Sequence, residues 1–183
     1  MHRWRAETDA VAIGIGTALA DDPLLTARTP YAARQPTRIV FDSAARLPLD
    51  SKLVGSVSEA PLLVVVAPDA PRDRTRTLER AGAELVVVAG SRADRVRAAL
   101  AQLGGRGLSS VLLEGGPILA GAFLEAGEVD GLRLFFAPRV LGGGRSLIEG
   151  AGVERIAQAR PALAVEWERV DEDLLLRARL REW

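Results

Sequence analysis

The stretch Val111 to Gly127, VLLEGGPILAGAFLEAG, constrains the fold more than any other part of the chain. An apolar run typical of a buried strand ends at Glu114, and two glycines then permit a tight turn. Pro117 suits the first turn of a helix, and the residues after it keep helical apolar spacing. This order predicts a strand, a glycine turn and a helix start.

The start of this predicted helix is a candidate phosphate site, because its free N–H groups and positive dipole end attract anions. The small residues Ala120, Gly121 and Ala122 would let a cofactor lie close to the backbone. Glu114, at the end of the strand, would face the group with which the cofactor reacts. The stretch alone is equally compatible with an ordinary strand-to-helix connection.

The rest of the apolar pattern predicts alternating strands and helices. Strands are expected at 10–15, 38–42, 62–67, 84–88, 108–114 and 132–138, and helices at 2–8, 73–81, 92–103 and 117–127. Two period-two runs, 162–170 and 173–180, predict an antiparallel hairpin with its turn at 171–172. The chain is therefore expected to form one α/β domain over residues 1–183, with a mixed, mostly parallel sheet flanked by helices on both faces.

Residues 17–36 are expected to form a long loop with a short helix at most, because their prolines break a regular crossover helix. Loops of this length are commonly functional or disordered. This one carries the charged residues Asp21, Asp22 and Arg28 on either side of the apolar anchors Leu24 and Leu25, and we interpret it as a site loop. The glycine-rich loop 140–146 predicts either closure over a ligand or a plain flexible connection.

Composition excludes several classes of function. The 24 basic and 24 acidic residues cancel and aromatic residues make up 4%, so nothing favours nucleic-acid binding. Cysteine is absent and the single histidine, His2, is interpreted as a solvated terminal residue, which argues against thiol chemistry and the usual zinc sites. No apolar run approaches the length of a membrane span, and no signal peptide is recognised. We therefore expect a soluble cytoplasmic protein, without a metal, that acts on a small molecule.

The common catalytic motifs fail on inspection. Gly14 and Gly16 follow a strand as in a dinucleotide-binding fingerprint, but Leu19 occupies the third glycine position and the following connection is broken by prolines. GxSxG and GxxxxGK[ST] are both absent from the sequence. Hydride transfer by a bound cofactor remains compatible, because it needs mainly positioning and electrostatics from the protein.

Several motifs together resemble the reductase domain of the bifunctional riboflavin-biosynthesis deaminase-reductase. They are, in chain order, GIGT at 14–17, LADDPLLTAR at 19–28, RIVFDS at 38–43, EGGP at 114–117 and APR at 137–139. The resemblance covers nearly the whole chain, and the LADDPLLTAR stretch is specific to that family. It implies a dihydrofolate-reductase-like fold and NADPH-dependent reduction of 5-amino-6-(5-phosphoribosylamino)uracil, in which the ribosyl group becomes ribityl. It also implies a homodimer.

The resemblance also implies roles for individual residues. Arg5, Leu25, Arg28 and Glu114 match substrate-contacting positions. The matches to NADPH-contacting positions are Thr17, Asp21, Ser43, Gly116, Pro117, Ile118, Leu119, Ala120, Gly121 and Ala122. The alternative functions are a nucleotide-binding remnant or paralogue without turnover, and a reductase of another pyrimidine or pterin-like substrate.

Members of that family begin this domain with a strand of the ASLDG type, which is absent here, so relative to the family the chain is interpreted as N-terminally truncated, either as a truncated reading or fragment of the gene or as a divergent stand-alone paralogue. In the fold that the chain resembles, this strand lies between those matching 108–114 and 132–138. Without it, these two strands would carry unpaired backbone groups. We therefore expect a stable protein to close the two strands together, to borrow a strand from another chain, or to remain partly disordered and prone to association.

Overall fold

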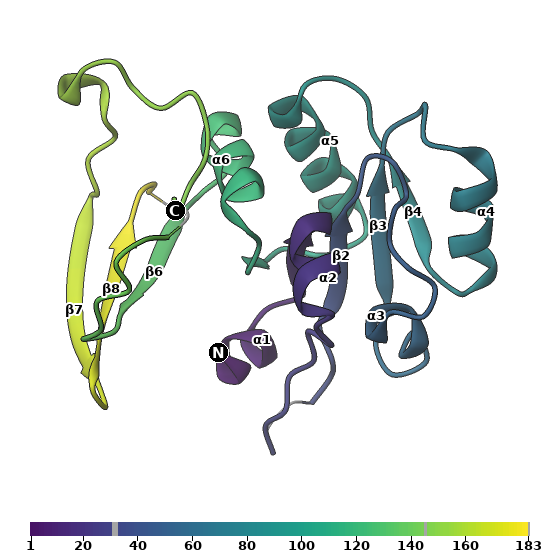
Figure 1. The fold of residues 1–183 in the computed structure, drawn as a ribbon, viewed down its shortest axis with the longest axis horizontal. Helices are drawn as coiled ribbons and strands as arrows, with labels where there is room; N and C mark the ends of the chain where they lie inside the picture. The colour runs from purple at the N-terminus through teal and green to yellow at the C-terminus, as the bar shows by residue number, and fades with distance from the viewer. Residues whose placement is uncertain (31–32, 145, 183) are drawn as a thin grey trace.

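The computed structural model describes residues 1–30, 33–144 and 146–182. Its elements are α1 (His2–Glu7), β1 (Ala10–Gly14), α2 (Ile15–Asp21), β2 (Thr37–Phe41), α3 (Lys52–Gly55), β3 (Leu62–Val66), α4 (Arg72–Arg80), β4 (Glu84–Val87), α5 (Arg92–Gly105), β5 (Val111–Leu113), α6 (Pro117–Ala126), β6 (Gly131–Phe136), the 3-10 helix η1 (Ile156–Gln158), β7 (Ala164–Val170) and β8 (Asp173–Arg179) (Figure 1). None of the helices in these ranges is long and apolar enough to cross a membrane.

Five strands form a parallel sheet in the order β4-β3-β2-β1-β5. The chain moves outward from β1 to β4 and then returns, through α5, to place β5 beside β1. Residues of β1, β2 and β3 are almost wholly buried, as continuous apolar strands covered on both faces should be. The predicted parallel sheet is confirmed.

Helices cover both faces of this sheet. On one face Ala18 of α2, Leu53 of α3 and Leu78 of α4 pack against the strands in one apolar cluster. On the other face Ala99 and Leu103 of α5 do the same in a second cluster. A third cluster joins α6 to α5. The helix that follows β1 therefore lies on one face, whereas the helix that follows β5 lies with α5 on the other.

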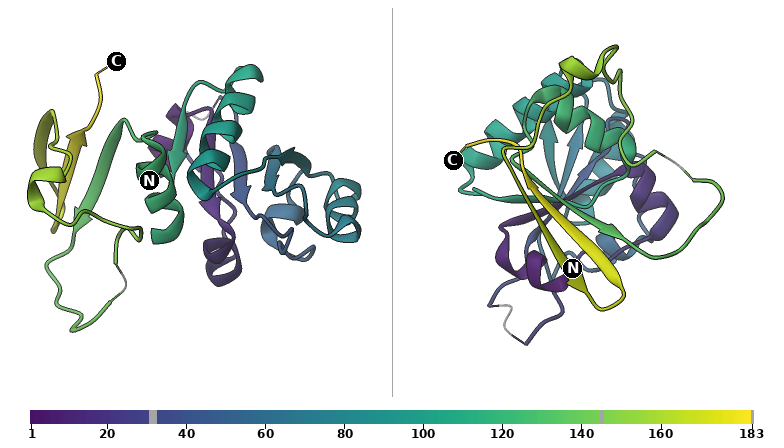
Figure 2. Two further views of the ribbon diagram at one scale, coloured as in Figure 1. Left: turned by 90° about the horizontal axis from the view of Figure 1, so that it is seen from above. Right: turned by 90° about the vertical axis from the view of Figure 1, so that its left-hand side faces the viewer.

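The remaining strands form a separate antiparallel sheet in the order β6-β8-β7. The predicted hairpin is confirmed, with β7 and β8 joined at Asp171, whose φ is 54°. Figures 1 and 2 show this sheet beside α6, away from α4. The expected α/β class with mostly parallel strands is thus confirmed, although the antiparallel strands do not extend the parallel sheet.

β5 and β6 each end a sheet, and within the described ranges no strand lies between them. α1 occupies this region instead. Its Trp4 ring lies 5.8 Å from the ring of Phe135 in β6, and the guanidinium carbon of Arg133 lies 4.6 Å from the Trp4 ring centre. Its Arg5 contacts Glu114, just after β5. α1 therefore bridges the two sheets by side-chain contacts without supplying backbone pairing to either strand.

Some element boundaries differ from those expected. α2 begins at Ile15 and so includes Gly16 and Thr17, because the strand ends one residue earlier than its apolar run. α5 continues through Gly105, and the chain turns at Gly107, whose φ of 80° suits glycine. The four-residue helix α3 and η1 were not expected.

Candidate functional site

The carboxyl ends of β1 and β5 mark the point where the sheet reverses its strand order. The two strands are neighbours, yet their following helices leave toward opposite faces. Such a divergence is where open α/β sheets bind ligands. The two helix starts meet here, because the Gly116 N–H donates to Thr17 Oγ1 over 3.1 Å.

Glycines let the two connections approach each other. A Cβ on Gly115 would lie 3.0 Å from Leu119 Cδ2 and 3.3 Å from the Gly14 nitrogen. α2 and α6 both begin after a glycine N-cap that supplies no side-chain hydrogen bond. In α6 Pro117 has no N–H, and those of Leu119 and Ala120 donate to the Gly116 carbonyl over 3.1 Å. The Ile118 N–H and the positive dipole end of the helix are therefore what this helix start offers to an anionic group.

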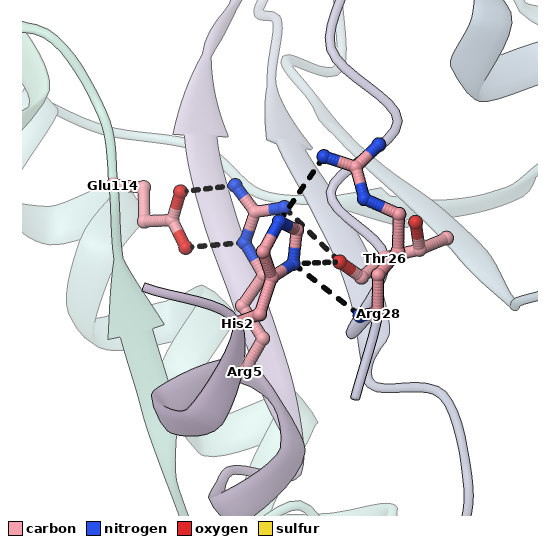
Figure 3. A network of polar contacts seen from close by, with 5 residues as sticks. All are labelled: His2, Arg5, Thr26, Arg28 and Glu114. Atoms are coloured by element: carbon pink, nitrogen blue, oxygen red, sulfur yellow. Dashed lines mark hydrogen bonds and ion pairs between the residues drawn. The ribbon is translucent and has the colours of Figure 1, made fainter. Parts of the chain in front are cut away.

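Arg5 and Glu114 form a two-pronged ion pair beside the helix starts (Figure 3). Arg5 Nε donates to Glu114 Oε1 over 2.7 Å and Nη2 donates to Oε2 over 2.6 Å. The two side chains are only 13% and 11% exposed. Paired contacts of this kind fix the carboxylate plane as well as its position.

The site loop is held against α1 by contacts from Arg5 and His2. Arg5 Nη1 donates to the Thr26 carbonyl over 3.1 Å, and His2 Nδ1 lies 3.1 Å from the same oxygen. His2 Nε2 lies 3.1 Å from Arg28 Nη2 (Figure 3). Three side chains from two segments thus converge with Glu114 of a third.

The sequence profile described as the RibD C-terminal domain matches residues 1–176. The chain belongs to the RibD C-terminal domain family. It is 40% identical over 163 residues to the 2,5-diamino-6-ribosylamino-4(3H)-pyrimidinone 5′-phosphate reductase of Methanothermobacter thermautotrophicus, covering 87% of this chain and 74% of that protein. It is 35% identical to the riboflavin biosynthesis protein RibD of Actinobacillus pleuropneumoniae, covering 96% of this chain and 47% of that protein.

Solved structures agree. Acinetobacter baumannii RibD, form 1, superposes with a TM-score of 0.81 at 27% identity, over 99% of this chain and 49% of that chain. The chain thus spans about half the length of these RibD proteins and about three quarters of the Methanothermobacter reductase. Membership of this family confirms the resemblance inferred from the motifs.

The structure places the expected substrate residues Arg5, Arg28 and Glu114 in one network: Arg5 bonds to Glu114, and His2 links Arg28 to the same network. Leu25 lies in the same loop, but its side chain is 2% exposed and packs in the core. Its φ of 57° is a left-handed conformation that costs a non-glycine residue on the order of 1 kcal/mol or more. The surrounding packing holds Leu25 in place, so it shapes the path of the loop toward Thr26.

The expected cofactor residues are only partly gathered. Thr17 and Gly116 touch, and exposed Ser43 follows β2 at the same edge of the sheet. Asp21 is exposed at the far end of α2 from that edge. Its neighbour Asp22 accepts from the Lys52 N–H over 2.8 Å and so anchors the start of α3.

The outer part of α6 differs from the expected open backbone. Leu119 and Ala122 are buried in the core, and Ile118 is exposed. Beside Gly121 a Cβ would lie 1.6 Å from the Glu149 carbonyl oxygen, so the small side of the helix admits the segment around Glu149. A cavity of about 670 Å³ lies between this segment, α6 and Arg92 at the start of α5. Contacts of 118–122 with a cofactor stay predictions.

Asp42 supports the turn that presents Ser43. Its carboxylate is buried and accepts from the Leu47 N–H over 2.8 Å. Burial raises its pKa, and the contact from Leu47 opposes that rise only in part. Asp42 therefore points into the protein, and Ser43 is the polar residue exposed at the end of β2.

The interpretation of His2 as a solvated terminal residue is wrong. It is half-buried and contacts both Thr26 and Arg28. The available signal was its spacing from Arg5, since residues three apart in a helix share a face. Thr26, 7% exposed, was also missed, because its carbonyl rather than its side chain does the binding.

Proposed function

We propose that this protein is an NADPH-dependent reductase of riboflavin biosynthesis that reduces the ribosyl group of 5-amino-6-(5-phosphoribosylamino)uracil to ribityl. The observation that supports it best is the meeting of two helix starts without side-chain caps beside the Arg5–Glu114 pair. One half of this arrangement suits a pyrophosphate, and the other half suits a polar heterocycle with a sugar phosphate.

The cofactor side is built from backbone and a hydroxyl group. Bound NADPH would supply hydride for the C1′ carbon of the sugar. The Ile118 N–H and the positive dipole end of α6, after Gly116 and Pro117, would hold its pyrophosphate. Thr17 Oγ1 accepts from Gly116, which leaves its own O–H to donate to the cofactor. Ser43 would contact the cofactor where it passes the end of β2.

On the substrate side, Glu114 would accept N–H groups of the pyrimidine, and Arg28 would bind the sugar phosphate. Arg5 donates one hydrogen bond to each oxygen of Glu114. Each oxygen has a second lone pair, which can still accept an N–H of the substrate. Arg5 also compensates the carboxylate charge, which would otherwise be costly so far from water. Arg5 thus orients the Glu114 carboxylate toward the heterocycle.

A second substrate is favoured by the named relatives. The reductases of Methanothermobacter thermautotrophicus and Archaeoglobus fulgidus, 40% and 32% identical, are named for the 2,5-diamino pyrimidinone. That compound has an amino group where the uracil has a carbonyl, so it offers one more N–H donor to a carboxylate, which can only accept. Both compounds carry the same ribosyl phosphate for Arg28.

The test is oxidation of NADPH, followed by its absorbance, with each pyrimidine and with neither. We expect turnover with at least one, and slower turnover with NADH. Cofactor binding without turnover of either compound would instead identify a nucleotide-binding remnant. Turnover confined to another pyrimidine or a pterin would identify the remaining alternative.

A homodimer in the cytoplasm is part of the proposal. One face of the antiparallel sheet carries Phe136, Val165, Trp167 and Leu174, all 41% to 58% exposed, and it lies opposite the face that Trp4 contacts. Continuous exposed apolar patches of this kind mark association surfaces. Trp167→Glu should convert the expected dimer into a monomer, as measured by the molar mass from light scattering. Leu49→Glu, at a similarly exposed apolar residue, should leave the dimer intact.

A further inference from the structure

His2 lies beside Arg5 of the ion pair and contacts two residues of the site loop, Thr26 and Arg28 (Figure 3). Its Nδ1 is 3.1 Å from the Thr26 carbonyl oxygen, and its Nε2 is 3.1 Å from Arg28 Nη2. The side chain is half-buried in the first turn of α1. Through these contacts His2 connects α1 to Arg28, the predicted phosphate-binding arginine.

Two of the three contacts of the ring favour one form of the imidazole. A carbonyl oxygen can only accept, so Nδ1 must carry the hydrogen. A guanidinium can only donate, so Nε2 must be bare. The neutral Nδ1–H tautomer satisfies these two contacts and forgoes the third, because the Arg28 backbone N–H, 3.3 Å from Nδ1, could donate only to a bare nitrogen.

The charge of this partner matters for Arg28. Arg5 is neutralised by Glu114, whereas the side-chain contact described for Arg28 is to an uncharged ring. A neutral acceptor orients one guanidinium nitrogen and leaves the positive charge and the other N–H groups available to an anion. A carboxylate in the same place would compete with a phosphate.

On the basis of the proposed function, we infer that His2 is a positioning residue, which as the neutral Nδ1–H tautomer holds the Arg28 guanidinium ready for the sugar phosphate of the substrate. His2 acts through Arg28 and through the Thr26 carbonyl. It takes no part in the transfer of hydride.

Two substitutions separate the contacts of the ring. The short amide introduced by His2→Asn can replace Nδ1 and keep the bond to Thr26, whereas the longer amide introduced by His2→Gln can replace Nε2 and accept from Arg28. We expect His2→Asn and His2→Phe to raise the KM for the phosphorylated pyrimidine by about fivefold to tenfold, with kcat and the KM for NADPH unchanged. His2→Gln should recover most of this loss.

Two controls test whether the effect runs through Arg28 and the phosphate. With the pyrimidine that lacks its 5′-phosphate, all three variants should match the parent. On an Arg28→Ala background, His2→Asn should have no further effect. Equal losses for all three substitutions, or a loss that persists without the phosphate, would overturn the inference.

A readout independent of turnover uses the single histidine of the chain. Nitrogen-15 correlation spectra of a protein without a histidine tag should show the neutral Nδ1–H tautomer near pH 7.5. Inorganic phosphate should shift its signals in the parent and not in Arg28→Ala. An Nε2–H tautomer, or signals indifferent to Arg28→Ala, would overturn the inference. If no pyrimidine is reduced, the proposed function fails and the phosphate titration alone decides about His2.

Discussion

Arg5 and Glu114, 109 positions apart in the chain, share two hydrogen bonds of 2.7 and 2.6 Å at the edge of the parallel sheet. This pair joins α1 to the end of β5. It belongs both to the site and to the link between the two sheets, because Trp4, one residue earlier, contacts Phe135 of β6. Changes to the pair should therefore affect stability as well as substrate binding.

Glu114→Gln and Arg5→Gln should each lower the free energy of unfolding by about 1–3 kcal/mol, because each leaves a mostly buried charge without its partner. The double variant should lose less than the sum, with a coupling of about 1–2 kcal/mol in a double-mutant cycle by urea unfolding. Additive losses would mean that the pair does not interact in solution. Arg3→Gln, at the exposed Arg3–Glu7 pair, is the control and should change stability by less than about 0.5 kcal/mol.

The glycine before α6 should be critical for cofactor binding. Gly116→Asp would place a carboxylate where the pyrophosphate is expected, and its Cβ would lie 3.3 Å from Thr17 Oγ1. We expect NADPH affinity to fall by about tenfold or more, measured by fluorescence titration. Gly104→Asp on α5, where a Cβ has open space, introduces the same charge and should leave affinity unchanged. Full affinity in Gly116→Asp would remove the pyrophosphate from this helix.

Arg28 should serve the substrate rather than the cofactor. A charge-assisted contact to phosphate contributes about 1.5–3 kcal/mol, so Arg28→Ala should raise the substrate KM by about tenfold or more and leave NADPH affinity nearly intact. Arg76→Ala, at an exposed arginine of α4, is the matched control. A variant weakened only toward NADPH would place Arg28 in the cofactor subsite.

Asp9 should make stability depend on acid pH. Hydrogen bonds from the Ser109 side chain and backbone, with further contacts from Arg34 and Ser110, hold the pKa of Asp9 below its usual range. A lowered folded-state pKa adds stability that is present above the unfolded pKa, near 4, and is lost as the pH falls toward the folded one. Asp9→Asn should therefore lower the Tm most near neutral pH.

That difference between Asp9→Asn and the parent should shrink as the pH falls below about 4, because the Asp9 carboxyl of the unfolded parent then takes up a proton while that of the folded parent stays ionised. Thermal unfolding followed by circular dichroism between pH 3 and 7 checks both statements, with Asp69→Asn in an exposed turn as the control. A difference that stays constant over this range would assign the effect to packing rather than charge.

The parallel sheet was predictable because its strands are continuous apolar runs, which remove their side chains from water only when helices cover both faces of the sheet. The hairpin was predictable from period-two spacing and its turn. Predicting two separate sheets required knowing where β6 lies. The local sequence pattern of a strand does not specify its pairing partner. The resemblance to a known family, and not the spacing, suggested that β5 and β6 would lack a common neighbour.

Site prediction was guided by residue types that themselves suggest chemistry, as for Arg28 and Glu114, which lie in one contact network and whose binding roles stay predictions. It failed for His2, because a histidine next to a chain end has no distinguishing pattern until α1 is placed against the site loop. It was also incomplete at Gly121. A small residue indicates close approach of something, but only the fold identifies the neighbour as the backbone of Glu149.

The last prediction concerns the edges of β5 and β6. Each strand pairs on one side only, with β1 and β8 respectively, and α1 bridges them through side chains alone. Unpaired backbone groups at such edges cost on the order of 1–3 kcal/mol each where they are shielded from water.

Extending the chain upstream of Met1 by a strand of the ASLDG type should satisfy both edges. We expect a rise in Tm of several degrees and faster NADPH-dependent turnover. An extension of equal length with prolines at alternate positions, which cannot donate to the ladder, is the matched control. Equal behaviour of the two extended proteins would show that α1 and solvent already satisfy these edges, and that the activity of the chain does not depend on a strand between them.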